Sequence, residues 1–265
     1  MPDQRSIKVQ APIEAPLQPD SIALAADRLG MSETSCELLD QRLLKQLEAA
    51  ALSDDRDDFL LLLSRAIDEG TTAEAMVDQY IPEVAREMGK RWCEDTLGFA
   101  RVTIGTSRLQ SALRDIEDTY YKDLHLDRNA ASVMLIVSQD VYHTLGAMVL
   151  ASQLRRNGLS VKLVLGECLE VLAEHLRHSS YQAVFISSSC GETLESLSKI
   201  VDVVTTSVDD RPPVVIGGTI LDVEPTGNVA ALTGADYATK ILSEALEFCG
   251  LTRPPLGQLH MTRGQ

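Results

Sequence analysis

The C-terminal half of this chain alternates short apolar runs, rich in β-branched residues, with longer stretches of helical periodicity. The apolar runs are residues 133–137, 161–165, 183–187 and 214–216, with a weaker one at 235–238. The helical stretches lie near residues 145–156, 169–178, 194–204, 223–232 and 241–248. Strands that alternate with helices form parallel sheets with right-handed crossovers. Because five such units match a flavodoxin-like order better than a longer dinucleotide-binding fold, we predict a doubly wound five-stranded parallel sheet over residues 126–250.

The first half of the chain shows a different pattern, in which apolar residues recur at helical spacing. We predict helices at residues 37–50, 59–70, 73–93 and 99–124. Their short connections indicate a four-helix bundle over residues 36–125, in which Pro82 bends the third helix or marks its first turn. Residues 1–35 hold four prolines among polar residues, so we expect a flexible leader there, and a flexible tail at 251–265.

Charge and composition exclude several classes of function. The formal net charge of −15 argues against direct nucleic-acid binding, which needs a surplus of Lys and Arg, and favours action on another protein. The sequence has no apolar run of about 18 residues and no signal-peptide core, so we expect a cytoplasmic protein that does not enter a membrane. Five cysteines without CxxC spacing favour reduced thiols over disulfides or a zinc site.

Three predicted strand ends carry residues suited to holding a ligand. They are His143 and Gly146 in the first loop, Ser187 and Ser189 in the third, and Gly217 and Gly218 in the fourth. The carboxyl ends of parallel strands meet at one edge of the sheet, where such folds bind ligands. The phosphate motifs GxxxxGK[ST] and, after the first strand, GxGxxG are absent, so nucleotide binding is the weaker interpretation. A histidine beside small residues favours a bulky ligand whose metal is bound by His143.

The order of these residues resembles the motif set of cobalamin-binding domains, in which DxHxxG, SxL and GG follow successive strands. His143-Thr144-Leu145-Gly146 matches HxxG, Ser187 matches the serine of SxL, and Gly217-Gly218 matches GG. Gly234-Ala235-Asp236-Tyr237 is similar to the family's closing GAD segment. The resemblance covers about residues 73–249, and it implies a helical bundle, a flavodoxin-like domain and cobalamin as the cofactor.

The resemblance also implies a role for each matched residue. His143 is expected to replace the cofactor's own dimethylbenzimidazole as the lower cobalt ligand. The displaced nucleotide tail then enters a groove in which Ser187 bonds the buried base. Three glycines, Gly146, Gly217 and Gly218, are expected to leave room for that tail.

Two positions depart from the family's pattern. Val141 stands where the family has the aspartate that orients the histidine. A metal-bound imidazole usually needs a partner for its other nitrogen, and Asp140, one place earlier, is the candidate if the loop is remodelled. Ser189 stands where SxL has its leucine, which predicts a more polar groove.

The bundle is expected to supply the opposite face of the site. The segment from Met88 to Asp95 resembles the tryptophan segment of bundles that cap the upper cobalt face in light-sensing cobalamin regulators. This resemblance places Trp92 over the corrin, with Phe99 at the next cap position, whereas helical periodicity alone favours Trp92 as a core residue. Val102 and Thr103 stand where light-sensing repressors have a Glu-His pair, so no upper histidine ligand is expected from that site.

Among cobalamin-binding proteins, the chain is most similar to the AerR/PpaA group of photosynthesis regulators. The resemblance implies a light- or redox-responsive regulator that contacts a transcription repressor of the CrtJ/PpsR type. No catalytic residues are predicted, because the serines near Ser188 do not form a GxSxG elbow. A corrinoid carrier for a methyltransferase and a heme-binding sensor stay open as alternatives, as does the oligomeric state.

Overall fold

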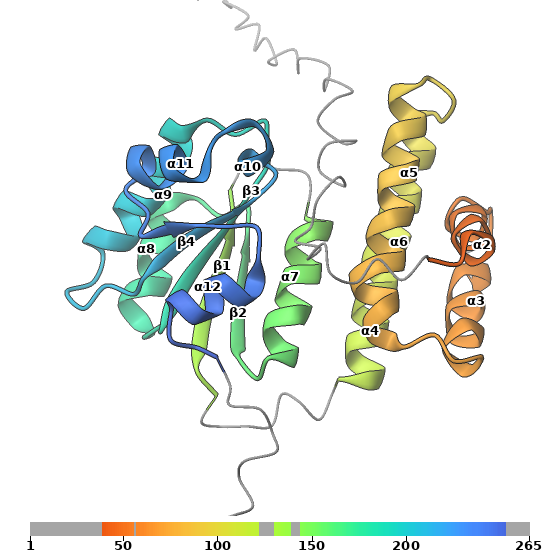
Figure 1. The fold of residues 1–265 in the computed structure, drawn as a ribbon, viewed down its shortest axis with the longest axis horizontal. Helices are drawn as coiled ribbons and strands as arrows, with labels where there is room; N and C mark the ends of the chain where they lie inside the picture. The colour runs from red at the N-terminus through yellow and green to blue at the C-terminus, as the bar shows by residue number, and fades with distance from the viewer. Residues whose placement is uncertain (1–38, 56, 122–129, 139–143, 253–265) are drawn as a thin grey trace, which may run out of the picture.

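The computed structural model describes residues 39–55, 57–121, 130–138 and 144–252, which include one five-stranded sheet (Figure 1). The strands are β1 (Ser132–Val137), β2 (Ser160–Leu165), β3 (Ala183–Ser188), β4 (Val214–Gly218) and β5 (Tyr237–Ala238). Every pairing is parallel, and the strand order is β2-β1-β3-β4-β5. This order confirms the predicted flavodoxin-like doubly wound sheet.

Burial explains why the strands were visible in the sequence. β1 and β3 are buried along almost their whole length, because helices cover both faces of a parallel sheet and central strands become continuous apolar runs. The edge strand β2 alternates between more and less exposed residues. β5 is shorter than the predicted 235–238, because Gly234 still caps the preceding helix in a left-handed conformation with φ of +79°.

Helices cover the sheet in two layers. One face packs against α8 (Leu169–His178), α9 (Leu194–Thr206), α10 (Ile220–Val223) and α11 (Thr226–Thr233). The other face packs against α7 (Leu145–Arg156) and α12 (Leu242–Phe248). The single helix predicted at 223–232 is wrong, because Pro225 keeps Glu224 extended and separates α10 from α11.

The first half of the described chain is helical, as predicted. It consists of α2 (Gln41–Ala51), α3 (Asp57–Asp68), α4 (Ala73–Ala75), the π-helical turn η1 (Met76–Tyr80), α5 (Ile81–Cys93) and α6 (Phe99–Tyr120). The first helix begins later than the predicted Glu37, because Asp40 is extended and its carboxylate accepts hydrogen bonds from the N–H groups of Arg42 and Leu43.

The π-helical turn η1 lies directly before Pro82. Proline has no N–H, so the Asp78 carbonyl lacks the usual donor four residues ahead. In η1 the N–H of Ile81 donates to the carbonyl of Met76, five residues earlier. Pro82 lies in the first turn of α5, which confirms one of the two alternatives predicted for this proline.

Helix α7 belongs to the cores of both halves of the protein. Ala147, Ala151 and Leu154 pack toward the sheet. Leu145 and Val149 instead join the core formed by the bundle helices. Figure 1 shows α7 between the sheet and α6. The bundle and the sheet therefore share one helix, and a shift of the bundle must be accommodated at α7.

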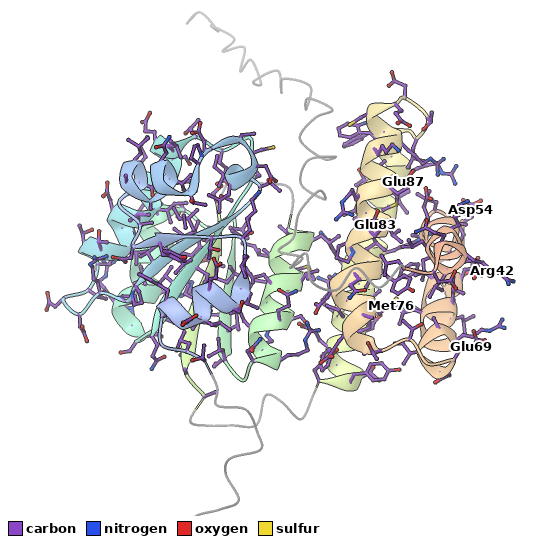
Figure 2. The ribbon with its side chains drawn as sticks, in the orientation of Figure 1. Arg42, Asp54, Glu69, Met76, Glu83 and Glu87 are labelled. Atoms are coloured by element: carbon purple, nitrogen blue, oxygen red, sulfur yellow. The ribbon has the colours of Figure 1, made fainter. Side chains whose placement is uncertain are left out.

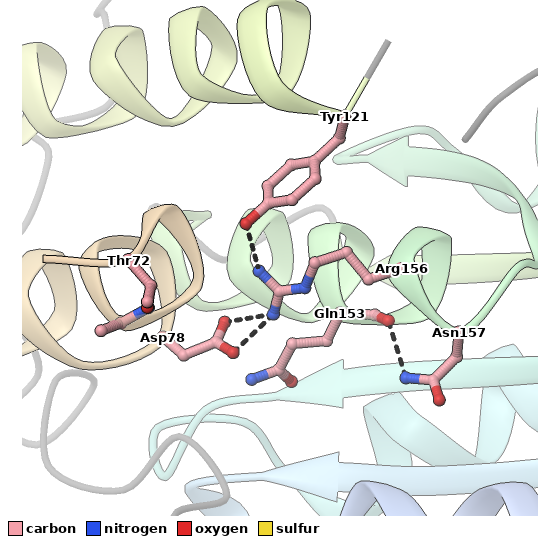
Figure 3. Close-up of polar contacts among 7 residues, drawn as sticks. Thr72, Asp78, Tyr121, Gln153, Arg156 and Asn157 are labelled. Carbon is pink, nitrogen blue, oxygen red and sulfur yellow. Dashed lines mark hydrogen bonds and ion pairs between the residues drawn. The ribbon is translucent and has the colours of Figure 1, made fainter. Parts of the chain in front are cut away.

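Ion pairs fix the carboxyl-terminal turn of α7 to the bundle. The Arg156 guanidinium donates to both carboxylate oxygens of Asp78 in η1, at 2.6 and 2.5 Å, and to the Tyr121 hydroxyl at 3.4 Å (Figure 3). Arg155 donates to both carboxylate oxygens of Glu117 in α6 at 3.0 Å. In each pair one guanidinium nitrogen contacts both carboxylate oxygens, and such charge-assisted hydrogen bonds are stronger than neutral ones.

The surroundings of Arg156 shift two pKa values. Burial acts to lower the pKa of Arg156, but the hydrogen bonds and negative charge of Asp78 outweigh it, so the pKa is raised. Burial raises the pKa of Tyr121, against the opposing effect of Arg156. Arg156 therefore stays charged and Tyr121 neutral at ordinary pH.

The side of the bundle away from α7 is polar. Figure 2 shows Arg42, Asp54 and Glu69 on that side, while Met76 lies inside and is fully buried. The predicted leader, and the predicted tail beyond Thr252, lie outside the described residues. No helix in the described ranges is long and apolar enough to cross a bilayer.

Candidate functional site

A pocket opens between α7 and α12 on one face of the sheet. It is partly open to solvent, and its enclosed volume is about 70 Å³. Its lining comes from α7, β3, β4 and the segment from β5 into α12: Gly146, Leu150, Gln153, Phe185, Ile186, Ser187, Val215, Gly217, Gly218, Thr239, Lys240, Ile241, Leu242 and Ala245. Most of these side chains are apolar or small, and a few polar groups lie near the strand ends. Such a lining suits a flat apolar group carried on a polar chain.

Four of the predicted site residues meet in this pocket. Gly146 comes from the first turn of α7, Ser187 from β3, and Gly217 and Gly218 from β4. Their meeting follows from strand register, because Ser187 pairs with Val137 on one side and with Gly217 on the other. The loops singled out in the sequence therefore line one pocket.

Ser189 does not line this pocket. Its backbone N–H donates to the carboxylate of Glu192 at 2.6 Å, within its own loop. Ser187 therefore lines the pocket and Ser189 does not, although we predicted both as cofactor-binding residues.

The two glycines of β4 are required by packing before any ligand is considered. Gly218 has φ of +104°, and a Cβ there would lie 2.1 Å from the Ser188 carbonyl oxygen. A Cβ on Gly217 would lie 2.9 Å from the Thr239 carbonyl oxygen. These contacts explain both glycines without a ligand, and the predicted role of leaving room for a tail stays a prediction.

Hydrogen bonds between loops hold the pocket edge together. Ser188, which the sequence did not single out, is 4% exposed and donates its hydroxyl to the Gly217 carbonyl at 2.8 Å. The N–H of Cys190 donates to the Thr219 hydroxyl at 2.9 Å. The ends of β3 and β4 are therefore held together by side chains as well as by the strand ladder.

The predicted metal ligand His143 and its predicted partner Asp140 lie outside the described residues, so both stay predictions. The next residue, Thr144, precedes α7, and its hydroxyl accepts a hydrogen bond from Gln110 of α6 at 2.9 Å. The chain position after His143 is thus connected to the bundle. Within the ranges that the structure describes, no three His, Cys, Asp or Glu side chains are arranged to hold a metal ion.

Trp92 and Phe99 form an aromatic pair at one end of the bundle. Their ring centroids are 6.0 Å apart, with the planes at 51°. Trp92, in the last turn of α5, is partly buried against the bundle core, while Phe99 begins α6 and is 52% exposed. Trp92 therefore has a core contact and also a solvent-accessible part.

The direction of α6 places Phe99 on the side of α7. Phe99, Gln110 and Glu117 recur on one face at the helical period, and the last two bond Thr144 and Arg155 of α7. Figure 1 shows the α5–α6 turn at the same end of the molecule as the carboxyl ends of the strands. Phe99 therefore lies beyond Gln110 on the α7-facing side, toward the ligand-binding edge of the sheet.

The far wall of the pocket was missed in the sequence. It is formed by Thr239, Lys240, Ile241, Leu242 and Ala245, which follow the weakest strand. The signal that could have found them is position, because the loop after β5 ends at the same edge as the other loops.

The closing Gly234-Ala235-Asp236 segment has a structural explanation. Gly234 caps α11 with positive φ. The Asp236 carboxylate pairs with Arg211 and accepts the N–H of Val214 at 2.8 Å. These residues start β5 and so place the far wall of the pocket.

Comparisons with known proteins agree with this geometry. A sequence profile described as the B12 binding domain matches residues 131–246. An uncharacterized 20.5 kDa protein in the bchF-crtJ intergenic region of Rhodobacter capsulatus is 38% identical over 170 residues, which are 64% of this chain and 88% of that protein.

Two solved structures were also found. One is a novel cobalamin-binding protein from Desulfitobacterium hafniense DCB-2, with 16% identity and a TM-score of 0.36, covering 78% of this chain and 97% of that one. The other is the methanol:cobalamin methyltransferase complex MtaBC from Methanosarcina barkeri, with 15% identity and a TM-score of 0.39, covering 95% and 94%. From the profile match and the Rhodobacter relative, this chain belongs to the B12 binding domain family and carries that domain over residues 131–246.

Proposed function

We propose that this chain is a cobalamin-binding regulator, responsive to light or redox change, that modulates a transcription repressor of photosynthesis genes through protein contact. One observation carries the proposal: the pocket of the B12 binding domain uses α7, the helix on which the bundle packs. A change at the cofactor therefore has a direct route to the bundle surface.

The chemistry of the pocket lining suits the nucleotide tail of cobalamin. Phe185, Val215 and Leu150 offer apolar contacts to a flat base, and the Ser187 hydroxyl is able to donate or accept a hydrogen bond. Gly146 lets the backbone approach closely. When bound, cobalamin supplies a cobalt ion whose axial ligands are exchangeable.

The regulatory part of the proposal has separate support. The Rhodobacter relative is described by its location beside crtJ, in a photosynthesis gene region. The net charge of −15 favours a protein partner over nucleic acid. Ion pairs from α7 to η1 and α6 give the bundle a defined position that a cofactor-dependent change can alter.

Absorption spectra test the cofactor assignment. The purified chain is mixed with hydroxocobalamin or hemin and freed of excess ligand. Retention of a corrinoid spectrum supports the proposal, whereas a Soret band with no retained corrinoid favours the heme alternative.

Partner binding tests the regulatory assignment. Corrinoid-loaded protein is mixed with a repressor of the CrtJ/PpsR type, in darkness and light and under oxidising and reducing conditions. A change in affinity between conditions is expected. Constant or absent binding, together with acceptance of a methyl group from a methyltransferase, would instead identify a corrinoid carrier.

His143→Ala is expected to remove the imidazole-bound corrinoid spectrum and to weaken cobalamin binding by about tenfold or more, while the protein stays folded. The exposed His178, whose imidazole bonds the Glu174 carbonyl of its own helix, provides the matched control as His178→Ala. An unchanged spectrum in His143→Ala would remove the ligand assignment.

Trp92 fluorescence tests the cap. Trp92 is the only tryptophan of the chain, so its emission can be followed without mutation. If the aromatic pair lies over the corrin, most of this emission is expected to be lost on cobalamin binding, because corrinoids absorb where tryptophan emits. Binding measured by absorption without loss of emission would place Trp92 away from the cofactor.

A further inference from the structure

Lys240 is the charged residue among the described residues that line the pocket. It lies between β5 and α12, where the loop leaves the carboxyl edge of the sheet. Its side chain is 24% exposed, so it does not lie deep in the protein. An apolar pocket with one cation at its mouth suits a ligand that has an apolar end and an anionic segment behind it.

The backbone on both sides of Lys240 is held in place. The Thr239 hydroxyl donates to the Glu244 carboxylate at 2.6 Å and accepts the N–H of Ile241 at 3.1 Å. The N–H of Thr239 continues the strand ladder to the Ile216 carbonyl. The backbone of Lys240 is therefore already ordered before a ligand binds, which reduces the conformational entropy lost when its side chain contacts the ligand.

Asp222 of α10 holds the ammonium group. Lys240 Nζ pairs with the Asp222 carboxylate, whose side chain is 13% exposed. An ammonium group has three N–H donors and is able to contact more than one anion. Asp222 also reduces the positive potential at the mouth, and with Glu244 it is the nearby negative charge that an anionic ligand must face.

We propose that Lys240 is the phosphate contact of the pocket, that it binds the phosphodiester of the cofactor's nucleotide tail, and that Asp222 limits the strength of this contact. The inference rests on the proposed cobalamin binding and adds a specificity-determining pair to it. In cobalamin the phosphodiester lies between the linker to the corrin and the ribose that carries the base. A base in the apolar interior therefore leaves the anion nearer the mouth, where Lys240 lies. Moving an anion out of water without a partner is costly, so a cation there favours the whole tail.

The test compares two corrinoids on the full chain. Cobalamin has the complete tail, whereas cobinamide has the same corrin without phosphodiester, ribose and base. Dissociation constants are measured by absorption titration for wild type, Lys240→Met, Lys240→Arg and Asp222→Asn. Thermal melts report whether each variant is folded.

Lys240→Met is expected to weaken cobalamin binding by about fivefold to tenfold, with cobinamide binding unchanged. Lys240→Arg keeps the charge and is expected to retain most of the affinity. Asp222→Asn is expected to tighten cobalamin binding, because a negative charge beside the ammonium group is removed. Higher ionic strength is expected to reduce the wild-type preference for cobalamin over cobinamide.

Three outcomes overturn the inference. Equal loss of both corrinoids in Lys240→Met means that Lys240 supports the fold and not the phosphate. No loss of either corrinoid means that the Lys240–Asp222 pair is structural only, and leaves cobalamin binding itself intact. If the wild type binds neither corrinoid, the proposed function fails together with the inference. Should Lys240→Met not fold, Asp222→Asn still decides the matter, because unchanged or weaker cobalamin binding in that variant overturns the inference.

Discussion

Gly218→Ala is expected to lower the free energy of unfolding by at least about 3 kcal/mol, because two separate penalties act at this position. Gly218 has φ of +104°, a conformation that residues with a Cβ rarely adopt. The added Cβ would also lie 2.1 Å from the Ser188 carbonyl oxygen and 2.9 Å from its nitrogen. These are backbone atoms of the paired strand, so relief requires β3 and β4 to move apart.

Urea unfolding followed by circular dichroism measures this loss. Gly227→Ala is the matched control, since a Cβ at Gly227 in α11 meets no atom within 4 Å. That control is expected to be neutral or to stabilise by up to about 1 kcal/mol, because alanine favours a helix. If Gly218→Ala unfolds within about 1 kcal/mol of wild type, the close contact of β4 with Ser188 is wrong.

The same contact affects the pocket. Gly218 and Ser187 lie on adjacent strands that form part of the lining. Movement between β3 and β4 would shift both, so a folded Gly218→Ala protein is expected to bind cobalamin less tightly than Gly227→Ala. Packing of the strand ends and ligand binding are therefore coupled at this residue.

The sequence predicted the sheet well because burial produced the pattern. β1 and β3 are covered by helices on both faces, so their apolar runs are continuous and begin and end close to the predicted positions. Local chemistry caused the errors. Pro225 divided one predicted helix into α10 and α11, and Asp40 delayed the start of α2. Each of these effects depends on one residue, whereas hydrophobic periodicity is averaged over many residues and does not locate the exact end of a helix.

The site was predicted in part for a similar reason. Gly146, Ser187, Gly217 and Gly218 follow strong strands, so the carboxyl-edge rule located them. Lys240 follows a strand of only two residues, and nothing local distinguishes it from a surface lysine. Its importance depends on α12 and Asp222, which are distant contacts that composition and periodicity do not report.

The double role of α7 was also absent from the pattern. Leu145 and Val149 pack on the bundle, while Ala151 and Leu154 pack on the sheet. A short helix that is apolar on two sides gives no strong periodic signal. Arg155 and Arg156 at its end form ion pairs with Glu117 and Asp78. These partners are distant in the sequence, so the pattern did not reveal the role of the arginines.

Arg156→Met is expected to lower the free energy of unfolding by about 2 to 3 kcal/mol, somewhat less than for a fully buried ion pair. Arg156 is 11% exposed and its partner Asp78 is 28% exposed, so loss of the cation leaves a carboxylate without its counter-charge in a partly dry interface. The Tyr121 hydroxyl loses its donor at the same time. Methionine keeps much of the apolar stem, so the change reports mainly on charge and hydrogen bonding.

Lys199→Met is the control for an ion pair that lacks such burial. Lys199 and Glu195 pair along α9 with side chains 60% and 80% exposed, so losing that pair is expected to change the free energy of unfolding far less than Arg156→Met does. Urea unfolding compares the two variants directly. Equal small losses would mean that the Arg156 contacts do not hold α7 to the bundle.

The Arg156 variant also separates folding from signalling. Arg155 still pairs with Glu117 in the variant, so the bundle is expected to stay attached but to be held less firmly at η1. Hydrogen exchange is therefore expected to increase in η1 and α7 and to change little in β1 and β3, which lie inside the sheet. If α7 transmits the state of the cofactor, this variant should retain cobalamin yet show a smaller difference in repressor binding between light and dark. An unchanged difference, despite faster exchange at η1, would show that the signal leaves the cofactor by a route other than this interface.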